Sequence, residues 1–331
     1  MIHRPVGLSR LLLGCLVLLA TPMGGSAQTD GAPSNEGALF LLLPIGAQGV
    51  AMGRAMTALP STESAFWNPA GLGGIEEGRF VVTRGDQVAG ESTAISVLWV
   101  KQPVGVFAFS WQLLDGGEIP FTDEQGNVRG QIDLRSHLGI ASFATSLRPW
   151  LRAGVNLKFI QENFDCNGPC EGIGVRSNGL AIDLGLQADH PGGLPIRLGA
   201  MAAHLGPDFQ VVNASQSDPL PSRLRISAGY DVLSNVDVPD MKLWLNVEVE
   251  DRWKDLGDQR SLYLGAELAA GTTDLIFVRA GYVDGEVGRA DGFAVGVGLQ
   301  YERFELSLGK NLAGSITGDS EPVHVTFGVV F

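Results

Sequence analysis

The sequence predicts an all-β fold in the form of a 14-stranded antiparallel transmembrane β-barrel. From about residue 75 to the end, apolar residues alternate with small or polar ones, which is the pattern of strands with two different faces. Fourteen such segments follow one another, and most have about the ten residues that a tilted strand needs to cross a bilayer. The chain also ends in an aromatic residue, Phe331, on the apolar face of its last segment.

The composition supports this fold and excludes several classes of protein. The chain has 331 residues, of which 45 are Gly, about twice the average share, as expected for many tight turns. A formal charge of −13 argues against a nucleic-acid partner, because a phosphate-binding surface needs a basic patch. Three Cys and five His are too few for a disulfide-dense scaffold or a metal array, and we expect no bound metal or cofactor.

Residues 1–27 are typical of a secretory signal peptide. Arg4 and Arg10 precede or border the apolar run 11–20, and Gly25-Ser26-Ala27 supplies the small residues of a cleavage site. The run is too short to span a bilayer, and no later stretch reaches about 18 consecutive apolar residues. The mature chain is therefore either soluble outside the inner membrane or a β-barrel.

The fourteen segments are joined by connections that alternate in length. Connections such as 102–103 and 271–273 are short, whereas 114–134 and 164–176 are long, as in outer-membrane barrels whose long loops lie outside. A soluble β-sandwich is the alternative, but fourteen strands exceed its usual number. The expected strands are 78–85, 92–101, 104–113, 135–147, 151–163, 177–189, 195–205, 222–232, 241–251, 260–269, 274–283, 291–302, 303–312 and 322–331.

The last segment resembles the end of bacterial outer-membrane barrels. Phe327, Val329 and Phe331 lie on its apolar face, and a terminal aromatic residue is typical of such barrels. We therefore expect the protein in the bacterial outer membrane, with outer-membrane lipid and the barrel assembly machinery as partners. Because the lumen of such a barrel is wider than that of an eight-stranded one, which side chains alone fill, something must occupy or line it.

A motif lies between the signal and the first strand. Residues 40–55 carry the run Phe-Leu…Gly-Ala…Ala-Met-Gly…Ala, and residues 67–72 read Trp-Asn-Pro-Ala-Gly-Leu. This stretch resembles the PorV/PorQ family of outer-membrane barrels, which is itself similar to the FadL/OmpP1/TodX transporters of hydrophobic compounds. Gln48 and Arg54 stand where Arg and a second Gly are expected from the family.

The resemblance implies that this stretch forms a hatch inside the lumen, as it does in both groups of relatives. The chain then divides into a signal peptide at 1–27, a hatch at 28–74 and a barrel at 75–331. The candidate hatch residues are Gly46, Met52, Gly53, Trp67, Asn68, Pro69, Ala70 and Gly71.

Local patterns within the motif predict its structure. The spacing of small residues over 47–58 predicts a short helix that packs close to a wall, and Gly53, Ala55 and Gly71 are expected where the backbone approaches that wall. The Asn-Pro pair at 68–69 predicts a helix N-cap or a tight turn. The turn closes the lumen in one interpretation and contacts a ligand in the other.

The strand alternation places twelve charged residues on the inward face of the barrel. Mixed charges in a lumen usually form a hydrated salt-bridge lining against a plug, and a selective ion path is the alternative. The residues are Arg152, Lys158, Glu162, Asp183, Arg197, Arg223, Arg225, Glu248, Glu250, Glu267, Arg303 and Glu305.

Cys166 and Cys170 lie in an expected outer loop with Gly-Pro between them. In an oxidising compartment this arrangement predicts a local disulfide.

For catalysis, the sequence has no G-x-S-x-G motif, and its His residues have no sequence partner that nominates a triad. We therefore predict that the protein is not an enzyme.

Two functions follow from the resemblance. PorV-like members assist type IX protein secretion at the outer membrane, which implies secreted cargo proteins or secretion components as partners. FadL-like members are conduits for hydrophobic ligands, long-chain fatty acids among them, which pass the hatch and leave through a lateral opening. The short expected outer loops favour the secretion-associated scaffold, and the hydrophobic transporter is the alternative.

Overall fold

The computed structural model describes residues 36–87, 90–123, 125–168, 175–210, 217–236, 238–254, 260–285, 291–312 and 323–331. The expected signal peptide lies outside these residues. Within them, no helix is long and apolar enough to cross a membrane.

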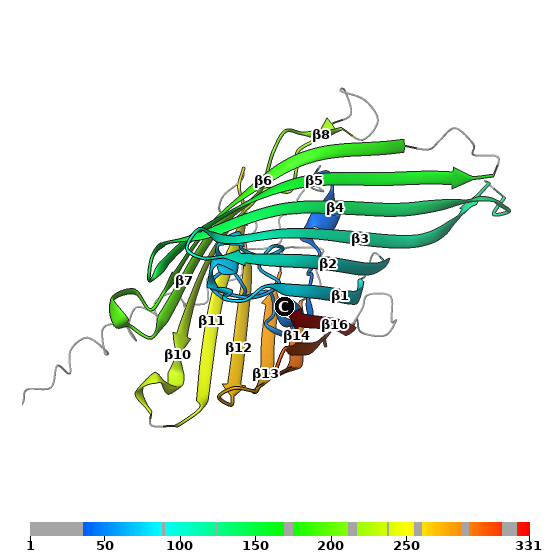
Figure 1. Cartoon of the computed structure of the whole chain (residues 1–331). Helices are drawn as coiled ribbons and strands as arrows, with labels where there is room; N and C mark the ends of the chain where they lie inside the picture. Colours follow the sequence, from blue (N-terminus) through cyan, green and yellow to red (C-terminus); the bar gives the residue numbers. More distant parts are fainter. Residues whose placement is uncertain are drawn as a thin grey trace, which may run out of the picture. The chain divides into compact units, whose positions relative to one another are not determined.

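Fourteen antiparallel strands close into a barrel, as the sequence predicts (Figure 1). Each strand pairs with its neighbours along the chain, and β1 pairs with β16 to close the ring. Closure leaves no unpaired sheet edge, which is the condition for a sheet that crosses a membrane. The strands are β1 (Arg79–Gln87), β2 (Gly90–Lys101), β3 (Gly105–Thr122), β4 (Val128–Arg148), β5 (Leu151–Asn167), β6 (Val175–Asp189), β7 (Ile196–Leu205), β10 (Arg223–Asp231), β11 (Met241–Arg252), β12 (Ser261–Ala270), β13 (Leu275–Asp284), β14 (Gly292–Tyr301), β15 (Phe304–Asn311) and β16 (Val323–Val330).

The two faces of the wall differ in burial and polarity. In β16, Val323, Val325 and Phe327 are exposed on the outside, while His324 and Thr326 are buried on the inside. Other strands repeat this alternation, so the outer face carries exposed aliphatic and aromatic side chains. An apolar outer face on a closed barrel is the surface that a bilayer requires. The fold is therefore that of a transmembrane barrel.

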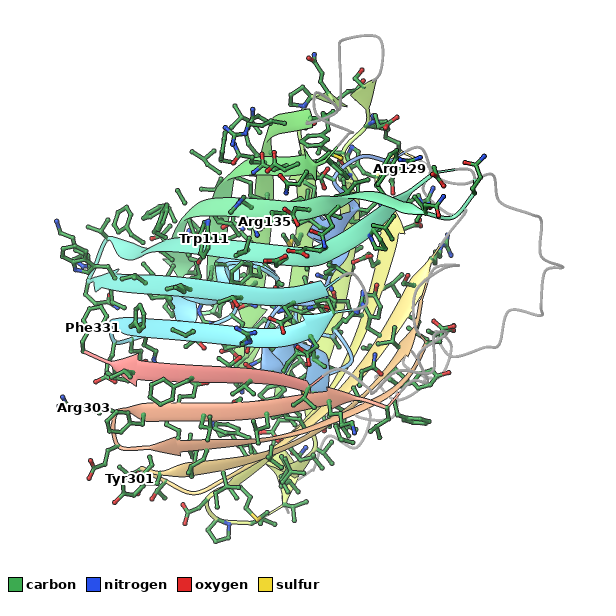
Figure 2. The ribbon with its side chains drawn as sticks, turned by 90° about the vertical axis from the view of Figure 1, so that its right-hand side faces the viewer. Trp111, Arg129, Arg135, Tyr301, Arg303 and Phe331 are labelled. Carbon is green, nitrogen blue, oxygen red and sulfur yellow. The ribbon has the colours of Figure 1, made fainter. Side chains whose placement is uncertain are left out.

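The connections between strands are short at one end of the barrel and mostly long at the other. Tight turns such as 102–104 and 302–303 lie at the short-turn end, where Figure 2 shows Tyr301 and Phe331. In outer-membrane barrels the short turns face the periplasm and the long loops face the exterior. This rule gives the direction in which the chain crosses the membrane.

Strands β3 to β6 extend farther than the sequence predicts (Figure 1). The expected loop 114–134 is largely strand, because β3 and β4 remain paired as far as Thr122 and Val128. The boundary prediction was wrong because the Gly-Gly pair 116–117 lies at a register shift, which interrupts the alternation that marks a strand. The expected loop 164–176 is likewise shortened by β5 and β6.

Residues 36–74, which precede β1, contain three short helices. Helix α2 begins at Ala47 as expected but ends at residue 51, so the predicted helix over 47–58 is too long. It ends there because Gly53 and Arg54 adopt left-handed backbone, with φ of 56° and 68°. The helices are η1 (Leu39–Leu42), α2 (Ala47–Ala51) and η2 (Pro69–Gly74).

Asn68 begins helix η2 as its N-cap. Its Oδ1 accepts a hydrogen bond from the Ala70 amide at 3.1 Å, which confirms the predicted cap. Its Nδ2 donates to the carbonyls of Thr57 and Leu186, so the same side chain links two parts of the segment to β6. One buried amide therefore fixes both the local turn and its place on the wall.

Glycines on the inner face of the wall let the segment 36–74 approach closely. An added Cβ at Gly309 would lie 2.3 Å from the Ala47 oxygen, and one at Gly281 would lie 2.1 Å from the Gly53 nitrogen. Because such glycines occur on β5 to β7 and on β12 to β15, the segment lies against two separate arcs of the inner face (Figure 1). They are Gly154, Gly185, Gly199, Gly265, Gly281, Gly296 and Gly309.

The small residues of the segment have two different roles. At Gly53, an added Cβ would lie 2.5 Å from the Tyr282 nitrogen and 2.8 Å from the Leu264 oxygen, so Gly53 meets the wall as expected. At Gly71, it would lie 2.4 Å from Ser64 Oγ, within the segment itself. Gly71 therefore tightens the turn of the segment rather than its contact with the wall.

We expect Gly53→Ala to loosen the segment and Gly192→Ala to leave it unchanged. Both glycines have left-handed φ, of 56° and 65°, but only Gly53 faces the wall, whereas nothing lies within 4 Å of Gly192. Overpacking typically costs about 1–3 kcal/mol, so amide hydrogen exchange in residues 47–57 should quicken about 5- to 150-fold in the first variant. Equal exchange in both variants would contradict the close approach.

Candidate functional site

The outer extension of β3 to β6 exposes an apolar face toward the inside of the barrel. This extension comprises residues 115–122, 128–135, 162–167 and 175–178. Its apolar side chains face one another across neighbouring strands, as Ile119 faces Ile132 and Leu134 faces Phe164. They lie on the same side as the buried, lumen-facing residues of these strands. The set is Ile119, Phe121, Ile132, Leu134, Phe164 and Val175.

The opposite face of the outer extension is polar. Asp133 pairs in register with both Glu118 and Asp165, and Figure 2 shows Arg135 and Arg129 along the same strand. Nearer the short-turn end this arrangement is reversed, since Phe107 and Phe109 are exposed outside while Ser110 is buried inside. A polar outer face indicates water rather than lipid, so the apolar inner face stands above the bilayer.

The apolar inner face continues into a buried cluster inside the barrel. Leu114, Leu138, Ile140 and Ile160 of β3 to β5 form its wall. Residues outside the barrel strands complete it: Phe40 of η1, and Phe209 of the two-residue strand β8 (Phe209–Gln210), which pairs with β9 (Ser217–Asp218). Leu41, Leu43 and Phe66 pack against the same cluster. An apolar surface therefore extends from the outer extension to the segment 36–74.

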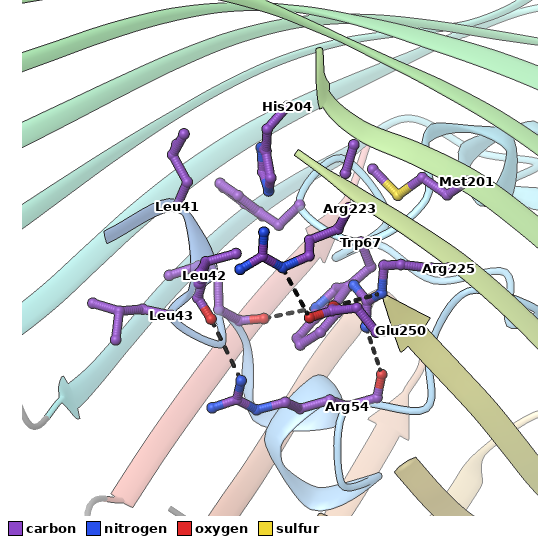
Figure 3. Close-up of a pocket in the computed structure, with 13 residues that line it drawn as sticks. Leu41, Leu42, Leu43, Arg54, Trp67, Met201, His204, Arg223, Arg225 and Glu250 are labelled. Carbon is purple, nitrogen blue, oxygen red and sulfur yellow. Dashed lines mark hydrogen bonds and ion pairs between the residues drawn. The ribbon is translucent and has the colours of Figure 1, made fainter. Parts of the chain in front are cut away.

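A pocket lies where this cluster meets the segment (Figure 3). Its cavity is about 30 Å³, room for about two water molecules, whereas a benzene occupies a cavity of about 150 Å³. The pocket is therefore closed to an organic molecule in this structure. Its lining residues are Leu41, Leu42, Leu43, Ile45, Arg54, Phe66, Trp67, Met201, Ala203, His204, Arg223, Arg225 and Glu250.

Two arginines of β10 hold the segment beside the pocket. Arg223, which is 2% exposed, donates to both carboxylate oxygens of Glu36 at 2.8 and 2.9 Å. Arg225 pairs with Glu250 at 3.2 Å and donates to the carbonyl of Arg54 at 3.1 Å. Because buried guanidinium groups are costly without partners, these contacts tie the segment to the wall.

Glu248 makes the corresponding contact from β11. Its carboxylate accepts hydrogen bonds from the amide and the hydroxyl of Thr57, both at 2.8 Å, and it pairs with Arg225 at 2.7 Å. All of these groups are buried. Because this carboxylate accepts from a backbone amide, it holds the backbone of the segment in place as well as pairing with Arg225.

Glu63 belongs to the segment and binds helix α2 from its N-terminal side. Its carboxylate accepts from the amides of Gln48 and Gly49 at 3.2 and 3.0 Å, and from the Thr326 hydroxyl at 2.8 Å. Burial raises the pKa of this carboxyl, and the three hydrogen bonds oppose the rise. The Thr326 hydroxyl also accepts from the Ala47 amide, so β16 and the segment share one hydrogen-bond network.

The candidate hatch residues are all buried or half-buried in the segment. An added Cβ at Gly46 would collide with the Glu63 carboxylate at 2.0 Å, which explains Gly at this position. Met52 packs against Trp67, whose Nε1 donates to the Ile45 carbonyl at 2.9 Å. Pro69, Ala70 and Gly71 form the first turn of η2 against β4 to β6, beside the Asn68 cap. Whether they gate a ligand stays a prediction.

Most of the charges expected to face inward are buried or half-buried, and Arg303 is the exception. It is exposed in the turn between β14 and β15, because β15 begins one residue later than expected. Arg279, which was not among the expected residues, lies inside and pairs with Glu267 at 2.7 Å. The paired charges agree with a salt-bridge lining.

The other predicted sites lie at the two ends of the barrel. Cys166 is in β5 rather than in a loop and is disulfide-bonded, while Cys170 lies outside the described residues, so their pairing stays a prediction. Phe327 and Val329 pair in register with β1, and the amide of Phe331 donates to the Gly78 carbonyl at 3.0 Å. A role of Phe331 in barrel insertion also stays a prediction.

Sequence reasoning placed Lys158 and Asp183 inside but missed His204, which joins them in a polar cluster beside the pocket. Lys158 of β5 lies 2.7 Å from Asp183 of β6 and 3.1 Å from Nδ1 of His204 on β7. Alternation alone places His204 outside, because Met201 and Ala203 are the buried positions of β7. The register of β6 and β7 shifts between Ile182 and Leu184, which turns His204 inward. No sequence signal marks such a shift.

Among the described residues, no group of three or more His, Cys, Asp or Glu side chains could hold a metal ion. The pocket therefore offers apolar contact, paired charges and the His204 ring, without any arrangement for metal chemistry in the described part of the chain.

We expect Glu248→Gln to release the segment around Thr57. A Gln amide would place an N–H donor opposite the donors of Thr57 and Arg225, and breaking such a buried pair costs about 2–5 kcal/mol. Arg54 is the one trypsin site between residues 36 and 74, so cleavage there should quicken at least about ten-fold. The exposed Glu302→Gln variant serves as control, and equal cleavage in both would disprove the Glu248 contact.

No family model matches the chain, and no curated protein matches its sequence. Solved structures do match its fold. The toluene transporter TbuX of Ralstonia pickettii is 14% identical, with a TM-score of 0.56 over 88% of this chain and 100% of that one. The toluene transporter TodX of Pseudomonas putida is 12% identical, with a TM-score of 0.58 over 87% and 99%.

A FadL homologue of Pseudomonas aeruginosa matches as well, at 7% identity and a TM-score of 0.53 over 86% of this chain and 97% of that one. At these identities the matches establish the fold alone. Together with the apolar outer face, they support a location in the bacterial outer membrane. The chain has the fold of FadL-type outer-membrane channels.

Proposed function

We propose that the protein is a passive conduit for hydrophobic small molecules across the outer membrane. The observation that carries this proposal is the reversed polarity of the outer extension of β3 to β6. Apolar side chains exposed to water do not stabilise the fold. A hydrophobic molecule that leaves water to contact them lowers its free energy. Its continuity with the buried cluster gives that molecule an inward path.

Residues 36–74, the described part of the expected hatch 28–74, act as the hatch of this conduit in our proposal. Three leucines of the segment, Leu41 to Leu43, line the pocket on one side (Figure 3), and Leu41 and Leu43 also pack against the apolar cluster. A cavity of about 30 Å³ admits no organic ligand, so passage requires this turn to move. Arg54 Nη1 donates to the Leu42 carbonyl at a long 3.4 Å, a weak bond to break.

The neighbouring structures support this proposal over the secretion-associated scaffold. TbuX and TodX are toluene transporters, so a hydrophobic ligand is the partner that they suggest. They also favour a protein without enzymatic activity. No feature of the described residues specifically favours a secreted protein as cargo, and the short outer loops remain the one sequence feature on the side of the scaffold.

Uptake of an uncharged monoaromatic compound by cells that produce the protein tests the proposal. Removing two facing apolar side chains, as in Leu134→Ser with Phe164→Ser, should slow initial ethylbenzene uptake at least about five-fold, the effect of about 1 kcal/mol of lost apolar contact. The matched control, Asp133→Ser with Asp165→Ser, changes the facing pair on the polar side and should leave uptake unchanged.

The folded state of each variant is checked by heat-modifiable gel mobility of the outer-membrane fraction. If the intact protein gives no uptake above cells that lack it, the proposed function is wrong. If both double variants slow uptake equally, the apolar inner face is not the route.

A further inference from the structure

We infer that the pocket, once the turn at Leu41 to Leu43 has moved, selects hydrophobic molecules that carry an uncharged hydrogen-bond acceptor, such as a ketone or ether oxygen, and that His204 Nε2 donates to this acceptor. This inference rests on the proposed conduit function and names the class of molecule that its pocket takes. It depends on three features: the position of the His204 ring, the atom that carries its proton, and the charge of the surrounding groups.

A bulge in the wall turns the His204 ring toward the pocket. Between the pairs Ile182↔Leu205 and Leu184↔Ala202, Asp183 alone faces two residues of β7, which is a β-bulge. His204 has a left-handed φ of 57°, and its side chain is 9% exposed. Its ring is among the residues that line the pocket (Figure 3).

Lys158 determines which ring nitrogen of His204 carries the proton. An ammonium group has donors only, so Nδ1 must accept from Lys158 Nζ at 3.1 Å. The proton of the neutral ring is then on Nε2. Asp183 holds the arrangement, because it accepts from Lys158 and from Asn156 Nδ2, both at 2.7 Å, and from the His204 amide at 2.8 Å.

His204 Nε2 is left as a donor that faces the pocket. In the part of the chain that the structure describes, the ring makes one hydrogen bond, and it uses Nδ1. Nε2 is not fully buried, and the ring that carries it lines the cavity. A buried donor that loses water costs about 1–3 kcal/mol unless the ligand supplies an acceptor. The pocket therefore favours a ligand with an acceptor over a plain hydrocarbon.

The charges around the pocket argue against an ionised ligand. Arg223 is paired with Glu36, and Arg225 with Glu248 and Glu250. Arg54, Arg223 and Arg225 carry three positive charges at this pocket, and Glu36, Glu248 and Glu250 carry three negative ones, so a carboxylate ligand would add a charge that has no counter-ion of its own. An uncharged acceptor satisfies His204 without adding this charge.

A pair of ligands with the same shape separates the hydrogen bond from apolar contact. Acetophenone and α-methylstyrene differ only in C=O against C=CH₂, and calorimetry on the detergent-solubilised full chain gives both affinities. We expect His204→Phe to weaken acetophenone binding about two- to ten-fold and to leave α-methylstyrene unchanged or tighter. His204→Gln, which keeps an N–H donor, should retain most of the preference.

A second measurement needs no variant. The infrared carbonyl stretch of ¹³C-labelled acetophenone bound to the intact protein should lie below its position in hexane, because a hydrogen bond weakens the C=O bond. An unshifted stretch, or a His204→Phe variant that weakens both ligands equally, would overturn the role of His204 while leaving the conduit function intact. If neither ligand binds the intact protein, the conduit function itself is wrong, and this inference falls with it.

Discussion

The pairing of buried lumen charges with the segment 36–74 is the interaction on which the rest of the structure depends. A barrel of fourteen strands encloses more space than its own side chains fill, and its inner face carries ionised groups that need partners. Glu248 accepts a hydrogen bond from the Thr57 amide, and Arg223 donates to the Glu36 carboxylate. Without the segment these groups would require water, and we expect the lumen to open.

Close approach makes this pairing geometrically feasible. Gly281 and Gly309 remove the side chains that would hold the segment away from the wall, so backbone meets backbone. The same tight packing leaves only a small cavity behind Leu41 to Leu43. In the proposed conduit, hydrogen bonds anchor the segment on β10, β11 and β16, while the turn at Leu41 to Leu43 is the part that moves.

The sequence is sufficient to predict the strand number and most of the inward charges, because both follow from the alternation that a lipid-facing outer surface requires. Arg303, in a turn, and Arg279, which is buried, are the exceptions. The sequence is insufficient where that alternation breaks. The register shift at Gly116-Gly117 interrupts the alternation within β3, so the strand is predicted too short. A bulge turns His204 inward, although the alternation of β7 places it outside. The helix predicted over 47–58 ends early because of the left-handed backbone at Gly53 and Arg54, which depends on contacts with the distant wall.

Conductance in planar bilayers tests most directly whether the segment closes the lumen. The chain without residues 36–74 keeps every strand pair and should still insert, which gel mobility verifies. Its lumen should then hold water where Arg223 and Glu248 lose their contacts with Glu36 and Thr57, so it should conduct ions steadily, while the intact chain should conduct little. Equal conductance of the two forms would contradict the account, because it would place the segment outside the conducting path.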